Sequence, residues 1–371
     1  LYSSLAIASA VIVITADTLL EIHLDQRCSL IEAIVNANDD DATHADCLAG
    51  NGADIIVLPA SSTQLLTAAH NSVYGPTGLP VITSTITIEG NGSTIARDSA
   101  APSFRILAVA SGAELRLHEI TIRGGASQRY EPQNDGEGGG VLNYGTLEVR
   151  NSDISQNTTD RGGGGAIYSE GGTLIVRDST LLGNSADGPG GAISQVRNSG
   201  TLVNTVCADN FTWLDGGCMW AGAASIVTVT NNTIRGNYSN LWGGGVRAEW
   251  NTVLVLQNST VSENHALGAG GGVSVGEHAT VLVENTTITG NISEMKGGGV
   301  LAEGTLTLVK NSTVSGNIAQ RGGGIVTGSG ATPKGTNMVM SSTITLNQAS
   351  EWGGGIINEA PGPLLLSHAL I

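Results

Sequence analysis

A unit of about 27 residues repeats from residue 145 onward, and this repeat restricts the possible folds more than any other feature of the chain. Aligning the units brings three columns of equivalent residues into register. The first column is Asn157, Asn184, Asn210, Asn237, Asn264, Asn291, Asn317 and Asn347. The second, six residues earlier, is Asn151, Asp178, Asn231, Asn258, Asn285 and Asn311. The third is a glycine pair before a small or aliphatic residue: Gly164 and Gly165, Gly190 and Gly191, Gly216 and Gly217, Gly244 and Gly245, Gly271 and Gly272, Gly298 and Gly299, Gly323 and Gly324, Gly354 and Gly355. Such a period predicts a solenoid, in which each unit buries its apolar face against its neighbours.

Short alternating segments rich in Val, Ile, Leu and Thr lie between these columns, for example at 253–256, 260–262 and 273–275. Alternation with a period of two is typical of strands. Three strands and three turns per unit make one coil of a parallel β-helix, whose equivalent residues stack about 4.8 Å apart. We therefore expect an all-β solenoid with aliphatic side chains inside each coil. The asparagines should form hydrogen-bonded ladders at the turns, and the glycines should occupy positions of positive φ or close backbone approach.

Two motif matches within the repeats have structural alternatives. The Asn-Ser-Thr, Asn-Thr-Thr and Asn-Phe-Thr strings fit the N-glycosylation pattern, but most fall on the asparagine columns, where we expect the side chain to be engaged in the stack. The glycine runs lack the Lys-Ser/Thr of a nucleotide-binding loop and no helix follows them, so we do not interpret them as phosphate sites.

The charge balance restricts the partners. The chain has 16 Lys plus Arg against 32 Asp plus Glu, and a net charge of −16. No basic stripe with interleaved aromatic residues is present in the sequence, so we expect no nucleic-acid partner. Residues 1–16 carry no charge before Asp17, but this apolar run is interrupted and too short to predict a membrane helix.

The four cysteines suggest two local disulfides. Cys28 and Cys47 flank a helical segment and an acidic loop, and Cys207 and Cys218 lie within one coil. No Cys-x-x-Cys or nearby His pair supports a zinc site instead. Residues 1–10 fit either the tail of a secretory signal peptide or a first strand. Disulfides form in oxidising compartments, so we expect a secreted or cell-surface protein.

Residues 28–38 give the one strong helical signal. Ser29 and Glu32 form a capping box, and apolar residues follow at helical spacing. We expect this helix to cover the open end of the first coil. The sequence is therefore divided into residues 1–60, with a strand, the capping helix and a disulfide loop, and residues 61–371, the β-helix.

Carboxylates cluster after this helix. The acidic loop contains Asp39, Asp40, Asp41 and Asp46, which are possible calcium ligands, although they lack the spacing of a known calcium loop. We expect no other cofactor.

The helical segment also carries a family resemblance. Residues 28–33, Cys-Ser-Leu-Ile-Glu-Ala, resemble the Cys-Ser-Leu-Arg-Glu-Ala motif at the start of many bacterial secreted β-helix proteins, with Ile31 in place of Arg. Gly-Gly-Ala-Ile at 190–193, with the asparagine column, resembles the repeats of the polymorphic outer-membrane-protein family, in the pectate-lyase-like superfamily. The resemblance implies a right-handed coil and export to the surface. The superfamily also contains polysaccharide lyases and hydrolases. The sequence stops within a coil at 364–371, which predicts further coils or a carboxy-terminal anchor beyond it.

A functional site is best sought where the repeat changes, at residues 201–250. This stretch contains four of the five tryptophans: Trp213, Trp220, Trp242 and Trp250. It also contains charged residues that are candidates for binding or catalysis: Asp209, Asp215, Arg235, Arg247 and Glu249. Tryptophan rings stack on sugars and carboxylates bind hydroxyl groups, so one interpretation is a glycan-binding groove. The alternative is that the tryptophans only fill space beside wide loops.

Enzymatic roles remain open for the same residues. A polysaccharide lyase would need Arg235 or Arg247 with a partner such as Tyr238 or His265. A glycoside hydrolase would need two carboxylates, for which Asp215 and Glu249 are the best candidates. Neither set has a diagnostic spacing, so no catalytic residue is assigned.

A third class of function comes from hydroxyl columns on the second strand of each coil. One column is Thr233, Thr260, Thr287, Thr313 and Thr343, and its neighbour is Ser262, Thr289, Ser315 and Thr345. This array resembles an ice-binding surface, but Arg235 interrupts it, and Ser and Thr are ordinary exposed strand residues. Our main prediction is an extracellular structural or adhesive rod that associates with itself or binds a polysaccharide or cell-surface glycan. A lyase or hydrolase is the alternative, and ice binding is a minor one.

Overall fold

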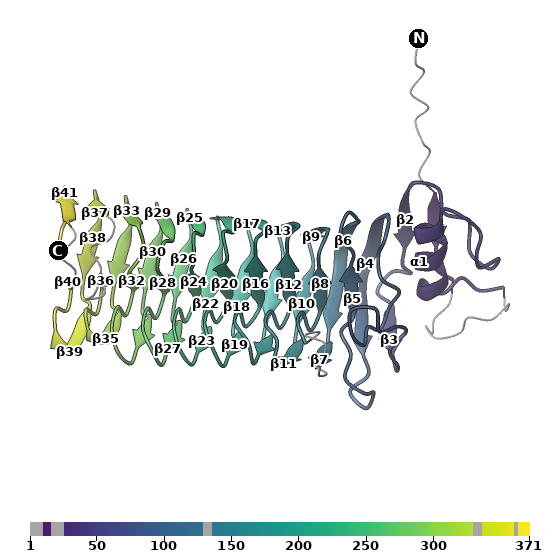
Figure 1. The fold of residues 1–371 in the computed structure, drawn as a ribbon, viewed down its shortest axis with the longest axis horizontal. Helices are drawn as coiled ribbons and strands as arrows, with labels where there is room; N and C mark the ends of the chain where they lie inside the picture. Colours follow the sequence, from purple (N-terminus) through teal and green to yellow (C-terminus); the bar gives the residue numbers. More distant parts are fainter. Residues whose placement is uncertain (1–9, 16–25, 129–135, 329–335, 360–362) are drawn as a thin grey trace, which may run out of the picture.

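The computed structural model describes residues 10–15, 26–128, 136–328, 336–359 and 363–371. In these ranges the chain winds into a long rod of stacked coils with one helix at its amino-terminal end (Figure 1). The strands of the rod form three parallel sheets, which we name the large, the nine-stranded and the ten-stranded sheet. Of the segment 1–10, residues 1–9 lie outside the described residues.

The large sheet takes two strands from each repeat. Its strands are β1 (Val11–Val13), β2 (Ala53–Val57), β3 (Thr63–Leu66), β4 (Thr85–Arg97), β6 (Glu114–Arg123), β9 (Thr146–Arg150), β10 (Asp153–Ser155), β13 (Thr173–Arg177), β14 (Thr180–Leu182), β17 (Ser199–Val203), β18 (Val206–Ala208), β21 (Ile226–Thr230), β22 (Thr233–Arg235), β25 (Val253–Gln257), β26 (Thr260–Ser262), β29 (Thr280–Glu284), β30 (Thr287–Thr289), β33 (Leu306–Lys310), β34 (Thr313–Ser315), β37 (Thr336–Met340), β38 (Thr343–Thr345) and β41 (Leu364–Ser367).

The other two sheets take one strand from each repeat. The nine-stranded sheet contains β7 (Ala126–Gln128), β11 (Thr158–Asp160), β15 (Ser185–Ala186), β19 (Phe211–Thr212), β23 (Tyr238–Ser239), β27 (His265–Ala266), β31 (Ile292–Ser293), β35 (Ile318–Arg321) and β39 (Gln348–Trp352). The ten-stranded sheet contains β5 (Leu107–Val109), β8 (Val141–Asn143), β12 (Ile167–Glu170), β16 (Ile193–Val196), β20 (Met219–Gly222), β24 (Val246–Ala248), β28 (Val273–Val275), β32 (Val300–Ala302), β36 (Ile325–Thr327) and β40 (Ile356–Asn358).

The pairing register confirms the predicted parallel β-helix and its coil length. Val227, Leu254 and Val281 pair in sequence, 27 residues apart, and all three side chains are buried in the interior of the rod. Stacking equivalent aliphatic residues in this way gives every coil the same core, which a single coil could not form alone. A typical coil has four strands rather than the three that we expected, because a two-residue strand such as β27 is too short to produce an alternating pattern.

The first asparagine column forms the predicted ladder inside the rod. The Nδ2 of Asn264 donates to the carbonyl oxygen of Ile234 at 3.0 Å and to Oδ1 of Asn291 at 2.9 Å. That same Oδ1 also accepts from the backbone N–H of Asn264 at 3.0 Å. Equivalent bonds occur at Asn157, Asn184, Asn210, Asn237, Asn291 and Asn317. Each carboxamide therefore links its own coil to the coils on both sides.

The second polar column forms part of the expected ladder, but on the surface: Nδ2 of Asn285 donates to Oδ1 of Asn258 at 3.2 Å. Asn258, Asn285 and Asn311 are exposed, with φ of +50°, +51° and +48°. Asparagine tolerates this left-handed conformation better than most residues. The sequence matches to the N-glycosylation pattern therefore fall into two groups. Asn157 and Asn210 are engaged in the buried ladder, as predicted, whereas the Asn-Ser-Thr matches at Asn258 and Asn311 lie on the exposed column.

The glycine pairs combine the two expected roles. Gly190 has φ +78°, and a Cβ on Gly191 would lie 2.2 Å from the carbonyl oxygen of Gly217 in the next coil. In the later coils the strand register places the positive φ at Gly243 and Gly270, one residue before the pairs that we aligned by sequence. The third glycine of those runs instead matches Ala166, Ala192 and Cys218 of the earlier coils.

The helix α1 (Leu30–Asp39) lies against β2 and β4 at the amino-terminal end, where it covers the coil (Figure 1). Ser29 and Glu32 form the predicted capping box. Both predicted disulfides are present, with Cα atoms 4.7 Å apart in Cys28–Cys47 and 5.9 Å apart in Cys207–Cys218. In the described ranges no helix is long and apolar enough to cross a membrane.

Candidate functional site

The centre of the candidate site lies on the outer side of the ten-stranded sheet. In β24, Val246 and Ala248 are in the core, so the alternation of the strand turns Arg247 outward. Arg247 pairs in register with Trp220 of β20 and with Ser274 of β28. These three residues come from successive coils, so the register of the solenoid, rather than their proximity in sequence, places them together.

Arg247 of this column and Glu249 form a largely buried ion pair. The Nε and Nη2 of Arg247 lie 2.9 and 2.5 Å from Oε1 of Glu249, and Nη1 donates to Oγ of Ser274 at 2.5 Å. Only 5% of the Arg247 side chain and 15% of the Glu249 side chain are exposed. The guanidinium carbon lies 4.8 Å from the centre of the Trp242 ring. Removal of either charge would leave the other poorly solvated.

Glu249 also organises the aromatic part of the site. Its Oε2 accepts a hydrogen bond from Nε1 of Trp220 at 3.2 Å. The space for this arrangement depends on glycines that the sequence did not distinguish from turn glycines. A Cβ on Gly276 would lie 2.9 Å from Cγ of Glu249, and a Cβ on Gly222 would lie 2.3 Å from the Trp220 ring.

Asp215 joins the cluster through the turn that precedes β20. Its Oδ1 accepts from the backbone N–H of Trp242 at 2.9 Å. Burial raises the pKa of Asp215 above its ordinary value, and the charge of Glu249 acts in the same direction, whereas the Trp242 hydrogen bond and Arg247 oppose the increase. We name Asp215, Trp220, Trp242, Arg247 and Glu249 the tryptophan cluster.

The other residues singled out from the sequence lie elsewhere. Trp213 follows β19 and is 57% exposed, with its ring 5.3 Å from that of Phe211. Trp250 occupies the turn after β24 and is also 57% exposed. Arg235 is on the large sheet, where its Nη1 lies 3.8 Å from Oδ2 of Asp209. Trp213 and Arg235 thus lie on other sheets than the centre of the tryptophan cluster, whereas Trp250 directly follows Glu249 at its edge.

The proposed partners of a catalytic arginine are also on another sheet. Tyr238 belongs to β23 and His265 to β27, with ring centres 5.0 Å apart. Nε2 of His265 lies 2.9 Å from Oε1 of Glu294. Neither residue therefore accompanies Arg247.

The carboxylates after α1 are engaged within their own loop. Asp39 accepts from the Thr43 hydroxyl at 2.6 Å, Asp40 from the Gly52 N–H at 2.6 Å, and Asp41 from the Ala42 N–H at 2.8 Å. Among the described residues, no group of three His, Cys, Asp or Glu side chains is placed to hold a metal ion, and this includes Asp46.

Tyr168, which the repeat pattern does not single out, extends the polar and aromatic surface toward the amino-terminal end. Tyr168 and Ser194 precede Trp220 in the same outward column. The Tyr168 hydroxyl donates to Oε2 of Glu170 at 3.1 Å, and Glu170 pairs with Arg197. Burial, followed by the charge of Glu170, raises the pKa of Tyr168 far above its ordinary value. The scarcity of tyrosine, six in the chain, is a signal that could have identified this region.

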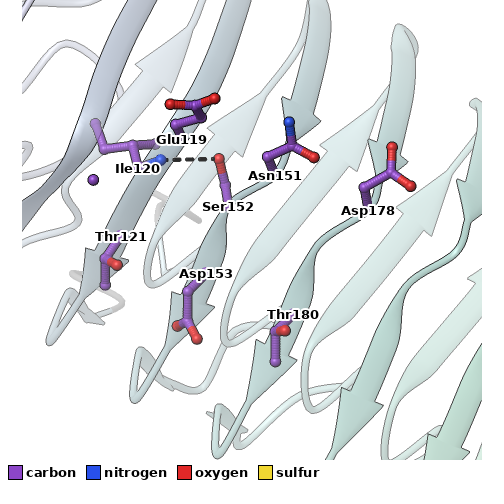
Figure 2. A pocket seen from close by; sticks show the side chains of 9 residues that line it. Glu119, Ile120, Thr121, Asn151, Ser152, Asp153, Asp178 and Thr180 are labelled. Carbon is purple, nitrogen blue, oxygen red and sulfur yellow. Dashed lines mark hydrogen bonds between the residues drawn. The ribbon is translucent and has the colours of Figure 1, made fainter.

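A separate depression of about 450 Å³ lies on the large sheet, near the turns that follow β9 and β13 (Figure 2). Glu119, Asn151, Asp153 and Asp178 line it, and the Ser152 hydroxyl accepts from the Ile120 N–H at 3.2 Å. Asp178 also accepts from Nδ2 of Asn204 at 2.9 Å. No aromatic or basic side chain lines this depression, so it lacks the features of the tryptophan cluster.

The hydroxyl columns of the second strands also exist in the structure. Thr233, Thr260, Thr287, Thr313 and Thr343 pair in register along β22, β26, β30, β34 and β38. The neighbouring column begins with Arg235 opposite Ser262, as expected.

Comparison with known proteins supports the fold. Residues 217–359 match a family model described as a right-handed β-helix region. The A-module of the mannuronan C-5 epimerase AlgE6 of Azotobacter vinelandii aligns with a TM-score of 0.55 and 15% sequence identity, over 92% of this chain and 93% of that structure. Among curated proteins no sequence matches the chain. These similarities support the predicted right-handed coil, but the identity is too low to transfer an activity.

Proposed function

We propose that this chain is an extracellular β-helix protein that binds an uncharged glycan at the tryptophan cluster. The observation that carries the proposal is the hydrogen bond that joins the Trp220 indole to Glu249, beside the 40% exposed ring of Trp242. Aromatic rings provide apolar faces for sugar rings, and carboxylate oxygens accept hydrogen bonds from sugar hydroxyls. Two disulfides and the absence of a membrane helix in the described ranges are consistent with an extracellular location.

The electrostatics favour a neutral rather than an acidic glycan. The positive charge of Arg247 is already compensated by Glu249 at 2.5 Å, so little of it remains for a uronate carboxylate. Asp215 adds a further acidic group, and the chain as a whole has a net charge of −16. The structural neighbour acts, by its name, on mannuronan, and this supports a saccharide as the class of ligand. The charge distribution of this chain opposes a polyanion.

A glycoside hydrolase is the second candidate, and a specific observation favours it. The raised pKa of Asp215 and its interaction with Glu249 resemble the division between a protonated acid and an ionised carboxylate that such enzymes use. In this alternative Asp215 would protonate the leaving oxygen and Glu249 would act as the base or nucleophile. The enclosure of Glu249 by Arg247 and Trp220 makes simple binding our preferred function.

Isothermal titration of neutral and uronate oligosaccharides tests the proposal. We expect neutral oligosaccharides to bind, and Trp242→Ala to weaken binding about fivefold to tenfold through loss of roughly 1 kcal/mol. Trp352→Ala is the matched control, since Trp352 is exposed and lies on β39, several coils from the cluster, and it should leave the affinity unchanged. Equal losses in both variants, or a preference for uronates, would contradict the proposal.

A reducing-end assay on the same oligosaccharides separates binding from hydrolysis. We expect no turnover. Turnover that is lost in Asp215→Asn but retained in Trp352→Ala would establish the hydrolase instead.

A further inference from the structure

A band of apolar side chains covers the outer face of the nine-stranded sheet. One outward column of this sheet consists of Phe211, Tyr238, His265, Ile292 and Ile318, which pair in register over five coils. Exposed apolar residues lie beside this column, just after its strands: Trp213, Leu214, Leu241, Leu267 and Met295. We name these ten residues the apolar stripe. Alternating strand residues such as Ala266 and Ser293 are buried, so the stripe is the outer layer of a rigid sheet.

The stripe is larger than scattered surface hydrophobic residues would produce. Its exposed side chains present on the order of 600 Å² of apolar surface, at the upper end of what monomeric proteins expose. A standard interface buries about 800 Å² on each partner. The stripe and its polar margin are therefore large enough for a reversible protein interface.

The arrangement of the aromatic rings favours a protein partner over a sugar. Phe211 and Tyr238 are stacked, with ring centres 5.5 Å apart and 16° between their planes. Trp213 and His265 approach these two rings edge to face, at 5.3 and 5.0 Å. Phe211 and Tyr238, at the aromatic end of the column, therefore pack mainly against other rings. A sugar needs a free face for stacking, whereas another apolar surface can pack against ring edges.

Charge and symmetry identify the partner. Two carboxylates border the stripe: Glu294, whose Oε1 lies 2.9 Å from Nε2 of His265, and Asp215, which directly follows Leu214 and accepts from the Trp242 N–H. The rest of the chain has a large negative excess, so two copies repel each other except where their surfaces carry few unpaired charges.

The stripe is also asymmetric along the rod, with aromatic residues at the Phe211 end and aliphatic residues and Met295 at the Ile318 end. An antiparallel two-fold arrangement would pack the aromatic end of one copy on the aliphatic end of the other. We propose that the apolar stripe is the contact through which two copies of this chain form an antiparallel dimer.

Sedimentation equilibrium over a concentration series tests the dimer. We expect wild type to dimerise reversibly, and Leu241→Lys with Ile292→Lys to shift the midpoint concentration upward at least tenfold. Ile226→Lys with Val253→Lys is the matched control, because these exposed apolar residues lie on the large sheet, and it should dimerise as wild type does. Added salt should strengthen association, since it screens the repulsion between two acidic chains. The proposal would be overturned if the wild-type chain stayed monomeric up to about 100 µM, the upper end of the series. Equal effects of the two double variants would also overturn it.

Cross-linking tests the geometry without disturbing the charge. All four native cysteines are in disulfides, so an introduced cysteine is the only free thiol. Leu267→Cys lies near the middle of the stripe and should form an interchain disulfide, whereas Ile226→Cys should not. The reverse pattern would contradict an antiparallel contact at this face. Glycan binding, measured on Ile292→Lys, should be unchanged because β31 contributes no residue to the tryptophan cluster, so the dimer and the proposed glycan site can fail independently.

Discussion

The two polar columns of the repeat differ in what their side chains do, although both are dominated by asparagine. The Asn264 side chain is fully buried, and it completes hydrogen bonds that the turn backbone would otherwise lack inside the rod. Asn258 is exposed: its backbone supports a left-handed turn, and its Oδ1 accepts from Nδ2 of Asn285 in the solvent-exposed part of the stack. The contribution of asparagine to stability should therefore differ between the two columns.

Asn291→Leu should lower the free energy of unfolding by about 1–3 kcal/mol, because the change removes donors to Val261 and Asn317 and leaves Asn264 without its acceptor. Asn258→Gly is the matched control and should change stability by about 0.5 kcal/mol or less, since glycine adopts positive φ without strain. Urea denaturation measures both. Equal effects would show that the buried ladder contributes nothing specific.

Asp215 gives a pH-dependent test at the same scale. Its pKa is raised in the folded protein, so folding favours the protonated form. Below the ordinary aspartate pKa, Asp215 is protonated in both the folded and unfolded states and does not affect the free energy of unfolding. As the pH rises through the ordinary pKa to the raised pKa, Asp215 lowers the free energy of unfolding progressively. We expect Asp215→Asn, which can keep the bond from Trp242, to be more stable than wild type at pH 7 and equal to it near pH 3. Thermal melts across this range would reveal a constant difference if the increase in pKa were absent.

At the scale of single elements, some strands can be located from the sequence pattern alone and others cannot. β25 and β26 show clear alternation, and both strands lie where the sequence predicts them. β27 has two residues, and its sheet is held by pairing with β23 and β31 rather than by its own pattern. For this reason the nine-stranded sheet, and the apolar stripe on it, could not be identified before the register was known.

The Cys207–Cys218 disulfide fastens β18 to the segment before β20 across the interior of one coil. Replacing both cysteines by alanine should lower the free energy of unfolding by about 3 kcal/mol, since the bond closes a loop of roughly 12 residues in the unfolded chain. Chemical denaturation of this double variant provides the measurement. Its control is the intact mass of wild type without reductant, which should lie four hydrogen masses below that of the reduced chain. Free thiols in wild type would contradict both the pairing and the oxidising compartment.

For the molecule as a whole, the repeat made the fold predictable, but only part of the site. Arg247 lies on β24 and Glu249 follows directly after its end, so their spacing of two residues already suggests that both side chains lie on the same side. Trp220 and Glu249 come from neighbouring coils, so predicting their contact needs the exact register between those coils. A repeat of about 27 residues suggests this register, but it does not determine the conformation of each loop. Trp213 is close to the cluster in sequence, yet it follows β19 of the nine-stranded sheet, whereas the centre of the cluster lies on the ten-stranded sheet. Sequence proximity in a solenoid therefore says less about contact than the position within the repeat.

The direction of the hydrogen bonds in this rod has a mechanical consequence. Bonds between coils, such as those of the asparagine ladder, run along the rod axis, so a force applied to its two ends loads the coils in series. Coils should detach one at a time, each releasing about 27 residues, or roughly 90 Å of extended chain. The coil that contains Cys207 and Cys218 should lengthen by about 36 Å less until its disulfide is reduced. In a force–extension trace, one short step among equal ones would then mark the position of that coil along the molecule.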